Sequence, residues 1–182
     1  DGSQAEMCGN ATRCVGKYVY DRGLTDKTQI TLETLAGIKI LDLNVKDGEV
    51  QTVCVNMGSP ELVPKNIPID SNLDRFISED VEVDGKVYKV TGVSMGNPHA
   101  VTFIDDTDSL EIEKIGPKFE THKLFPKKIN TEFAQIVDRN TIKMRVWERG
   151  AGETLACGTG ACATMVAANL NGLVDDEADL VL

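Results

Sequence analysis

The sequence has few basic residues, few aromatic residues and no long apolar run. Its 182 residues include 19 Lys and Arg against 29 Asp and Glu, which gives a net charge of −10 and a pI near 4.7. A nucleic-acid-binding surface needs clustered Lys and Arg to neutralise phosphates, and a membrane-spanning helix needs roughly 18 or more successive apolar residues. The sequence therefore predicts no nucleic-acid partner and no membrane partner, and it favours a small-molecule ligand.

The chain also lacks the features of a disulfide scaffold or a structural metal site. Five cysteines are an odd and low number for a disulfide framework. Their spacings, with only His99 and His122 elsewhere, do not match the paired short spacings of zinc sites. No signal peptide is visible. We expect no metal and a cytoplasmic location, where the cysteines stay reduced.

Alternating polar and apolar residues predict strands in both halves of a soluble globular chain. In the first half they form an antiparallel meander over residues 28–57, with turns at Ala36-Gly37 and Asp47-Gly48. The break at Gly58-Ser59-Pro60 indicates a domain crossing near residues 51–60. Beyond it we expect two strands over 81–93 that are separated by a turn at Asp84-Gly85, then strands over 100–104, 131–137 and 141–147, a weak helix over 111–121 and the start of a strand at the C-terminus.

Cys157 stands at the predicted start of a helix. Glycine and small residues follow it, the next residues are good helix formers, and Asn171-Gly172 provides a stop signal. The first N–H groups of a helix, here those of Gly158 and Thr159, have no partner inside the helix, and the helix dipole favours anions. The pattern predicts an exposed sulfur with a lowered pKa beside a carboxylate-binding site.

The same arrangement occurs at the other end of the chain. Cys8 is followed by Gly9, Asn10, a small residue and, after two more positions, a second cysteine that begins a helix-like run. Two thiols at two helix starts indicate a pair that works together. The remaining cysteines are expected to be buried apolar side chains; they are Cys14, Cys54 and Cys162.

Further polar residues lie at strand ends. The proline turn Asn97-Pro98-His99 would hold an amide and an imidazole toward one point, and Glu148-Arg149 ends the strand that leads to the Cys157 loop. Asn130 precedes a strand and alone means little. We expect function at His99 and at Glu148-Arg149.

Three motifs in order resemble the diaminopimelate epimerase family. They are Asp-Gly-Ser-x-x-Glu-Met-Cys-Gly-Asn-x-x-Arg-Cys at 1–14, Gly-Asn-Pro-His at 96–99 and Glu-Arg-Gly-x-Gly-Glu-Thr-x-Ala-Cys-Gly-Thr-Gly at 148–160. One departure is Ala11, where many members have glycine.

The resemblance implies an α+β fold of two pseudo-symmetric domains, each a curved antiparallel β-sheet around a central α-helix, with the active site in the interdomain cleft. Residues 1–52 would belong to the N-terminal domain and 53–182 to the C-terminal domain. Because the chain starts at Asp1 without Met, we expect an upstream portion of the first domain to be missing and the chain alone to have little activity. A homodimer is expected from the family only.

The implied activity is a bacterial, cofactor-independent epimerase that interconverts LL- and meso-2,6-diaminopimelate for lysine and peptidoglycan synthesis. Cys8 and Cys157 would exchange a proton on opposite faces of the α-carbon; the order of their roles stays open, although the family usually has the first as donor and the second as acceptor. His99 and Glu148 would contact the reacting amino group, and Arg149 would bind the distal carboxylate. The implied substrate-binding residues are Gly9, Asn10, Asn97, Asn130, Glu148, Arg149, Gly158 and Thr159.

Two alternatives stay open. One is a cofactor-independent proline or hydroxyproline racemase of the same superfamily, although those enzymes typically have histidine where Asn10 stands. The other is a non-catalytic binding or thiol-redox protein in which Cys8 and Cys157 form a regulated disulfide.

Overall fold

The chain divides into two compact units between Ser59 and Pro60. The computed structural model describes residues 7–182, so residues 1–6 of the first motif lie outside the described part. The division lies beyond the expected 52/53 boundary because strand β3 (Glu49–Asn56) still pairs within the first sheet. Each unit has its own sheet and core, and each is described by itself.

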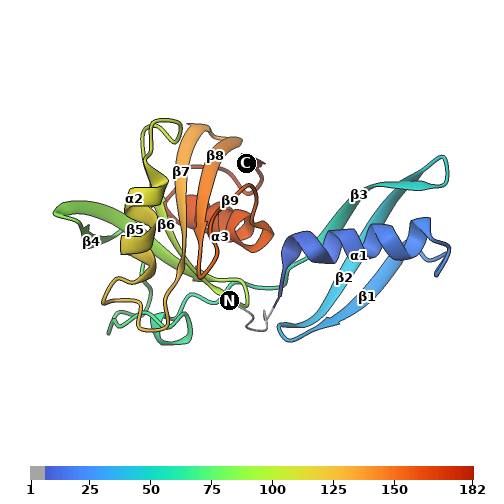
Figure 1. Cartoon of the computed structure of the whole chain (residues 1–182), viewed down its shortest axis with the longest axis horizontal. Coiled ribbons are helices and arrows are strands. Elements are labelled where there is room, and N and C mark those ends of the chain that lie inside the picture. The colour runs from blue at the N-terminus through green and yellow to red at the C-terminus, as the bar shows by residue number, and fades with distance from the viewer. Residues whose placement is uncertain (1–6) are drawn as a thin grey trace. The chain divides into compact units, whose positions relative to one another are not determined.

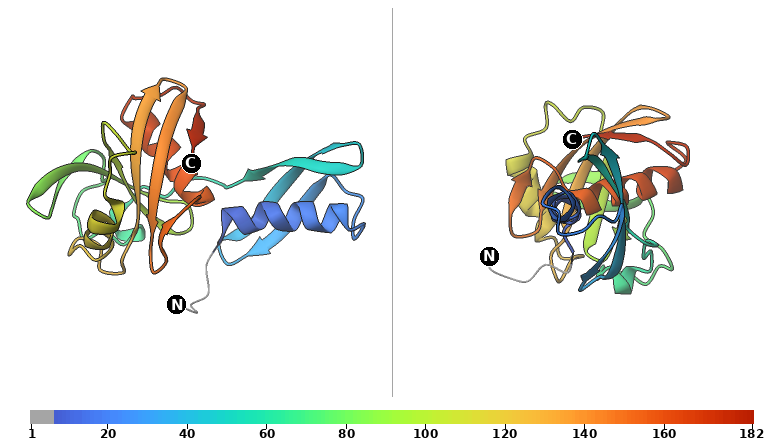
Figure 2. Two further views of the ribbon diagram at one scale, coloured as in Figure 1. Left: turned by 45° about the horizontal axis from the view of Figure 1, so that its top comes forward. Right: turned by 90° about the vertical axis from the view of Figure 1, so that its right-hand side faces the viewer.

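In the first unit a helix packs on a small antiparallel sheet. Helix α1 (Gly9–Asp21) covers one face of β1 (Gln29–Thr34), β2 (Gly37–Lys46) and β3, which lie in that order (Figures 1 and 2). This confirms the predicted meander.

The core of this unit depends on a close approach between helix and sheet. Leu41, Leu43 and Val50 are buried beneath α1. A Cβ atom on Gly16 of α1 would lie 3.0 Å from Leu41 Cδ2 and 3.1 Å from Leu43 Cδ2. Glycine at this position therefore allows the helix to rest directly on the two leucines.

The second unit holds a seven-stranded sheet with two helices. The strand order is β10-β8-β7-β6-β5-β4, and β9 pairs with β8. The elements are η1 (Pro64–Asn66), β4 (Glu79–Val83), β5 (Lys86–Ser94), β6 (Pro98–Phe103), α2 (Ile112–Glu120), β7 (Asn130–Asp138), β8 (Thr141–Glu148), β9 (Gly152–Thr154), α3 (Gly158–Leu170) and β10 (Asp179–Val181).

The α+β class is confirmed, but the expectation of a wholly antiparallel sheet is wrong for this unit. The pairs β6–β7 and β8–β10 are parallel, and the others are antiparallel. A parallel pair requires a crossover connection rather than a tight turn. Here α2 lies in the connection from β6 to β7, and α3 lies in the connection from β8 to β10.

The two helices cover opposite faces of the sheet. Successive residues of a strand point to opposite faces, and accordingly Phe133 packs in the core that contains Phe119 of α2, whereas Ala134 packs with Ala168 of α3. The strand β7 is therefore buried on both sides, and its first residues lie beside the start of α3 (Figure 1).

The packing of α2 on the sheet gives a test of this arrangement. A Cβ atom on Gly116 would lie 2.4 Å from the Trp147 ring, so we expect Gly116→Ala to lower the free energy of unfolding by about 1–3 kcal/mol through overpacking. Urea unfolding followed by the fluorescence of Trp147, the only tryptophan of the chain, measures it.

The control is Lys114→Ala on the same helix. Lys114 is exposed and pairs only with Glu111, so its loss should cost at most about 0.5 kcal/mol. Equal urea midpoints for the two variants would show that the ring does not constrain position 116.

Candidate active site

Cys157 is the N-cap of α3, as predicted. Its backbone is extended, with φ −130° and ψ 109°. The sulfur accepts a hydrogen bond from the Gly160 N–H at 3.3 Å and lies 3.4 Å from Thr159 Oγ1. The thiol is thus folded back over the first turn, among the N–H groups that a helix leaves unpaired.

Cys8 is the N-cap of α1 with nearly the same backbone geometry, φ −128° and ψ 107°. Its carbonyl accepts bonds from the Thr12 N–H and the Thr12 hydroxyl, at 3.0 and 2.8 Å. The Asn10 side chain accepts a bond from Arg13 at 2.7 Å. The repeated sequence pattern is therefore also a repeated local structure, one copy in each unit.

The environment of Cys157 corrects two expectations. Its side chain is buried, at 6% exposed, rather than open. Burial first, and then the carboxylates of Glu132 and Glu148, raise the pKa of Cys157 to about 12, although the bonds from Thr159 and Gly160 oppose the shift. The expected lowering of the pKa by the helix start is outweighed, and Cys157 is a neutral thiol near pH 7.

The other three cysteines also differ from expectation. Cys14 and Cys54 are exposed, and Cys162 is half-buried. Cys14 lies on the face of α1 that points away from its sheet, and Cys54 lies on the outward face of β3. The core of this unit is filled instead by Leu41, Leu43 and Val50.

A chain of hydrogen bonds connects the Asn97-Pro98-His99 turn with Cys157. The amide of Asn97 donates to Thr159 Oγ1 at 3.1 Å, and Asn97 Oδ1 lies 3.1 Å from His99 Nε2. His99 Nδ1 lies 2.6 Å from Glu132 Oε1. The proline turn thus places its amide and its imidazole as predicted, with Thr159 between Asn97 and the sulfur.

Glu132 is the member of this chain that sequence reasoning missed. It is fully buried, as is His99. The sequence did offer one signal, an acidic residue inside a predicted strand. However, both faces of the strand Asn130–Asp138 are covered, and the sequence alone does not show what each face contacts. His99 has both ring nitrogens engaged, so a direct contact with a substrate would need one bond to open; its catalytic role stays a prediction.

Asn130 joins the proline turn to the Glu148-Arg149 turn. Its amide donates to the Pro98 carbonyl, and its Oδ1 accepts the backbone N–H of Arg149, each at 2.8 Å. From the other side, Glu120 of α2 accepts the Trp147 ring N–H at 2.8 Å and the Gly150 N–H at 3.1 Å. The turn that carries Glu148 and Arg149 is fixed at both ends.

The second unit therefore gathers most of the predicted site. It brings together Asn97, His99, Asn130, Glu148, Arg149, Cys157, Gly158 and Thr159. Cys8, Gly9 and Asn10 lie in the first unit. The Glu148 carboxylate accepts a bond from the Thr154 hydroxyl.

Other site types receive no support within residues 7–182. No group of three His, Cys, Asp or Glu side chains there is placed to hold a metal ion. None of the helices in this range has the length and the apolar character to cross a membrane.

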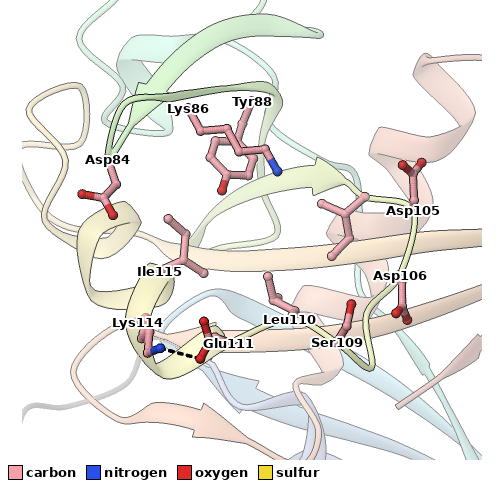
Figure 3. Close-up of a pocket in the computed structure, with 11 residues that line it drawn as sticks. Asp84, Lys86, Tyr88, Asp105, Asp106, Ser109, Leu110, Glu111, Lys114 and Ile115 are labelled. Atoms are coloured by element: carbon pink, nitrogen blue, oxygen red, sulfur yellow. Dashed lines mark hydrogen bonds and ion pairs between the residues drawn. The ribbon is translucent and has the colours of Figure 1, made fainter.

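A pocket of about 470 Å³ lies elsewhere in the second unit. Figure 3 shows Tyr88 and Lys86 of β5 facing the segment that leads into α2, which contributes Asp106 and Glu111, and the first turn of α2, which contributes Lys114. None of the predicted site residues lines it.

Sequence comparison agrees with the site. The family model described as diaminopimelate epimerase matches residues 1–63 and 91–182. The diaminopimelate epimerase of Acetivibrio thermocellus is 62% identical over 182 residues, which cover 100% of this chain and 65% of that protein. That of Methanococcus maripaludis strain S2 is 56% identical, with 100% and 66% covered. The chain thus spans about two thirds of the length of these curated relatives.

Solved structures support the fold. A hydroxyproline epimerase from Agrobacterium vitis with bound trans-4-hydroxy-L-proline matches with a TM-score of 0.69 at 14% identity, covering 93% of this chain and 54% of that one. A PhzF-family phenazine biosynthesis protein of Bacillus anthracis matches with a TM-score of 0.62 at 19% identity, covering 98% and 61%. At such identities the likeness shows the fold alone.

The raised pKa of Cys157 predicts a loss of stability at alkaline pH. Since an unfolded thiol ionises near its ordinary pKa of 9.0 while the folded thiol keeps its proton to about 12, the folded state binds more protons in this window. Stability is therefore full below about pH 9 and falls as pH rises toward 12, by at most about 1.4 kcal/mol per pH unit.

Urea unfolding at about pH 8 and about pH 10 in wild type and Cys157→Ala isolates this contribution. We expect the variant to lose less stability than wild type between the two pH values. Cys54→Ala, at an exposed position, should behave as wild type; an identical pH dependence in all three proteins would contradict the prediction.

Proposed function

Because this chain belongs to the diaminopimelate epimerase family, we propose that it carries the catalytic cysteines of an isomerase that interconverts LL- and meso-2,6-diaminopimelate without a cofactor. The chain spans about two thirds of its relatives' length, so the activity proposed is that of the whole protein. The observation that carries the proposal is the pair of cysteine N-caps with matching backbone angles, one at the start of each glycine-led helix.

The reaction needs two proton-transfer groups of opposite protonation. One sulfur, as thiolate, takes the proton from the α-carbon, and the other, as thiol, delivers a proton to the opposite face. Cys157 is a neutral thiol in this structure, so the direction that starts from this state has Cys8 as base and Cys157 as acid. After turnover Cys8 holds the proton and Cys157 is the thiolate, and the reverse reaction exchanges these roles. This order differs from the one that the family usually has.

An amino-acid α-proton is weakly acidic, so the charge that builds on the carboxylate must be stabilised. The first-turn N–H groups of α1 and α3, at Gly9, Asn10, Gly158 and Thr159, are suited to this because they lie at the positive ends of the two helix dipoles. Glu148 and His99 would assist at the amino group. We further propose Asn97 and Asn130 as substrate contacts and Arg149 as the partner of the distal carboxylate.

Two further properties accompany the enzyme. We propose a cytoplasmic protein, since both catalytic groups act as reduced thiols, and a homodimer, which the family resemblance implies. The small-molecule substrate follows from the proposed reaction.

Deuterium exchange tests the role of Cys157. In heavy water we expect the whole protein to place deuterium on the α-carbon of LL-diaminopimelate, and Cys157→Ser to reduce the rate at least about 100-fold because a proton-transfer group is lost. Proton NMR of the substrate measures it, with circular dichroism to establish folding. Cys54→Ser, at an exposed position of β3, serves as the control; exchange that survives in folded Cys157→Ser defeats the proposal.

Arg149→Lys tests substrate recognition. A lysine keeps the charge but loses the planar fork that binds a carboxylate through two bonds, so we expect KM to rise about tenfold or more with a smaller change in kcat. Arg139→Lys is the matched control, since Arg139 pairs with Asp175 at an exposed turn. A KM that matches wild type would remove Arg149 from the substrate site.

A further inference from the structure

Glu132 is a buried carboxylate for which the proposed reaction has no use. Its side chain is fully buried in β7, and one oxygen, Oε1, lies 2.6 Å from His99 Nδ1. The other oxygen, Oε2, is buried and has no hydrogen-bond partner among residues 7–182. Burying an ionisable group that is only half satisfied is costly, so such a group commonly has a role in a site.

Gly160 shows how close this carboxylate comes to the thiol. A Cβ atom built on Gly160 would lie 2.6 Å from Glu132 Oε1 and 3.2 Å from Cys157 Sγ. The carboxylate and the sulfur therefore converge on one point beside the first turn of α3. A side chain at position 160 would separate them, and glycine allows them to approach.

The hydrogen-bond chain gives the same two residues a second connection. Because the Thr159 hydroxyl oxygen accepts from the Asn97 amide, its own hydrogen is free to point at Cys157 Sγ, which lies 3.4 Å away. Asn97 is held in this orientation by His99, and His99 is held by Glu132. Glu132 thus stands at the far end of a path that orients a donor toward the sulfur.

We propose that Glu132 is a positioning residue with two effects on Cys157. Its charge beside the sulfur keeps Cys157 protonated between turnovers, and the chain of His99, Asn97 and Thr159 holds in place the hydroxyl donor that stabilises the thiolate when it forms. The catalytic meaning of this role rests on the proposed epimerase function. The charged and titratable groups that face Cys157 are Glu132 of β7, Glu148 of β8 and, behind Asn97, His99 of β6. His99 offsets the charge of Glu132 only while its ring carries both protons.

This role of Glu132 suits a reaction that moves a proton between sulfur and a weakly acidic carbon atom. When the Cys157 S–H bond breaks and a new Cα–H bond forms, the sulfur keeps the electron pair as a thiolate. A carboxylate nearby makes that thiolate more basic, which brings its basicity closer to that of the α-carbanion in the reverse reaction. The Gly160 N–H and the Thr159 hydroxyl then stabilise the thiolate during its short life.

The test is the ionisation of Cys157 in Glu132→Gln. Glutamine keeps the shape and the acceptor for His99 but removes the charge. We expect the midpoint of Cys157 ionisation to fall by about one pH unit or more. The ¹³Cβ resonance of Cys157, assigned by its loss in Cys157→Ser, is followed from about pH 7 to about pH 12.5, so that the range includes the wild-type midpoint.

Two variants separate charge from packing. Glu132→Asp keeps the negative charge and should stay closer to the wild-type midpoint than Glu132→Gln does. Glu120→Gln makes the same chemical change at another buried glutamate, which contacts Trp147, Lys128 and Gly150 rather than Cys157; its Cys157 midpoint should equal wild type. Circular dichroism establishes that each variant is folded under the conditions of the titration.

The outcomes are distinct. A wild-type midpoint in folded Glu132→Gln overturns the proposal, and so does an equal fall in Glu132→Asp, which would show that packing alone sets the ionisation. Because the titration needs no turnover, its result stands whether or not deuterium exchange supports the epimerase function.

Discussion

The absence of a side chain at Gly160 allows the start of α3 to lie directly against the edge of β7. Without a Cβ there, the Cys157 sulfur folds back onto the Gly160 N–H and the Glu132 carboxylate comes close to it from the sheet. The Asn97 turn reaches Thr159 from β6, and the Asn130 amide binds the turn that carries Arg149. The site is therefore built on paired strands and a helix start, which hold side chains more firmly than loops do.

The sequence predicted the turns and helix starts that depend only on residues close together in the chain. Glycine-bearing turns at Asp47-Gly48 and Asp84-Gly85 separate strands where expected, because Asp and Gly both adopt the positive φ that these turns require. The two cysteine-led helix starts were also predictable, since small residues followed by helix formers mark such a position. The parallel pairing of β6 with β7 was not, because it depends on how a crossover through α2 returns to the sheet.

The pKa of Cys157 and the position of Glu132 were missed because they too depend on how distant parts of the chain pack together. A helix start lowers a thiol pKa only where water or other donors stabilise the thiolate; at Cys157 the surrounding strands exclude water and place two carboxylates nearby. Glu132 could not be identified as its neighbour because residues 132 and 157 are far apart in the chain and meet only through the sheet order. Sequence therefore predicts the sulfur and its helix, whereas tertiary packing decides the charge that the sulfur carries.

The duplicated motif places two thiols in the same local structure but in different surroundings. Both cysteines have nearly the same backbone angles and begin helices led by glycine, so the repeated sequence alone would make them equivalent. Their surroundings do not repeat. The core beneath α1 is made of Leu41, Leu43 and Val50, while the start of α3 meets Glu132 and the fixed turn at Glu148. Residues outside the repeated motif therefore set the protonation of Cys157.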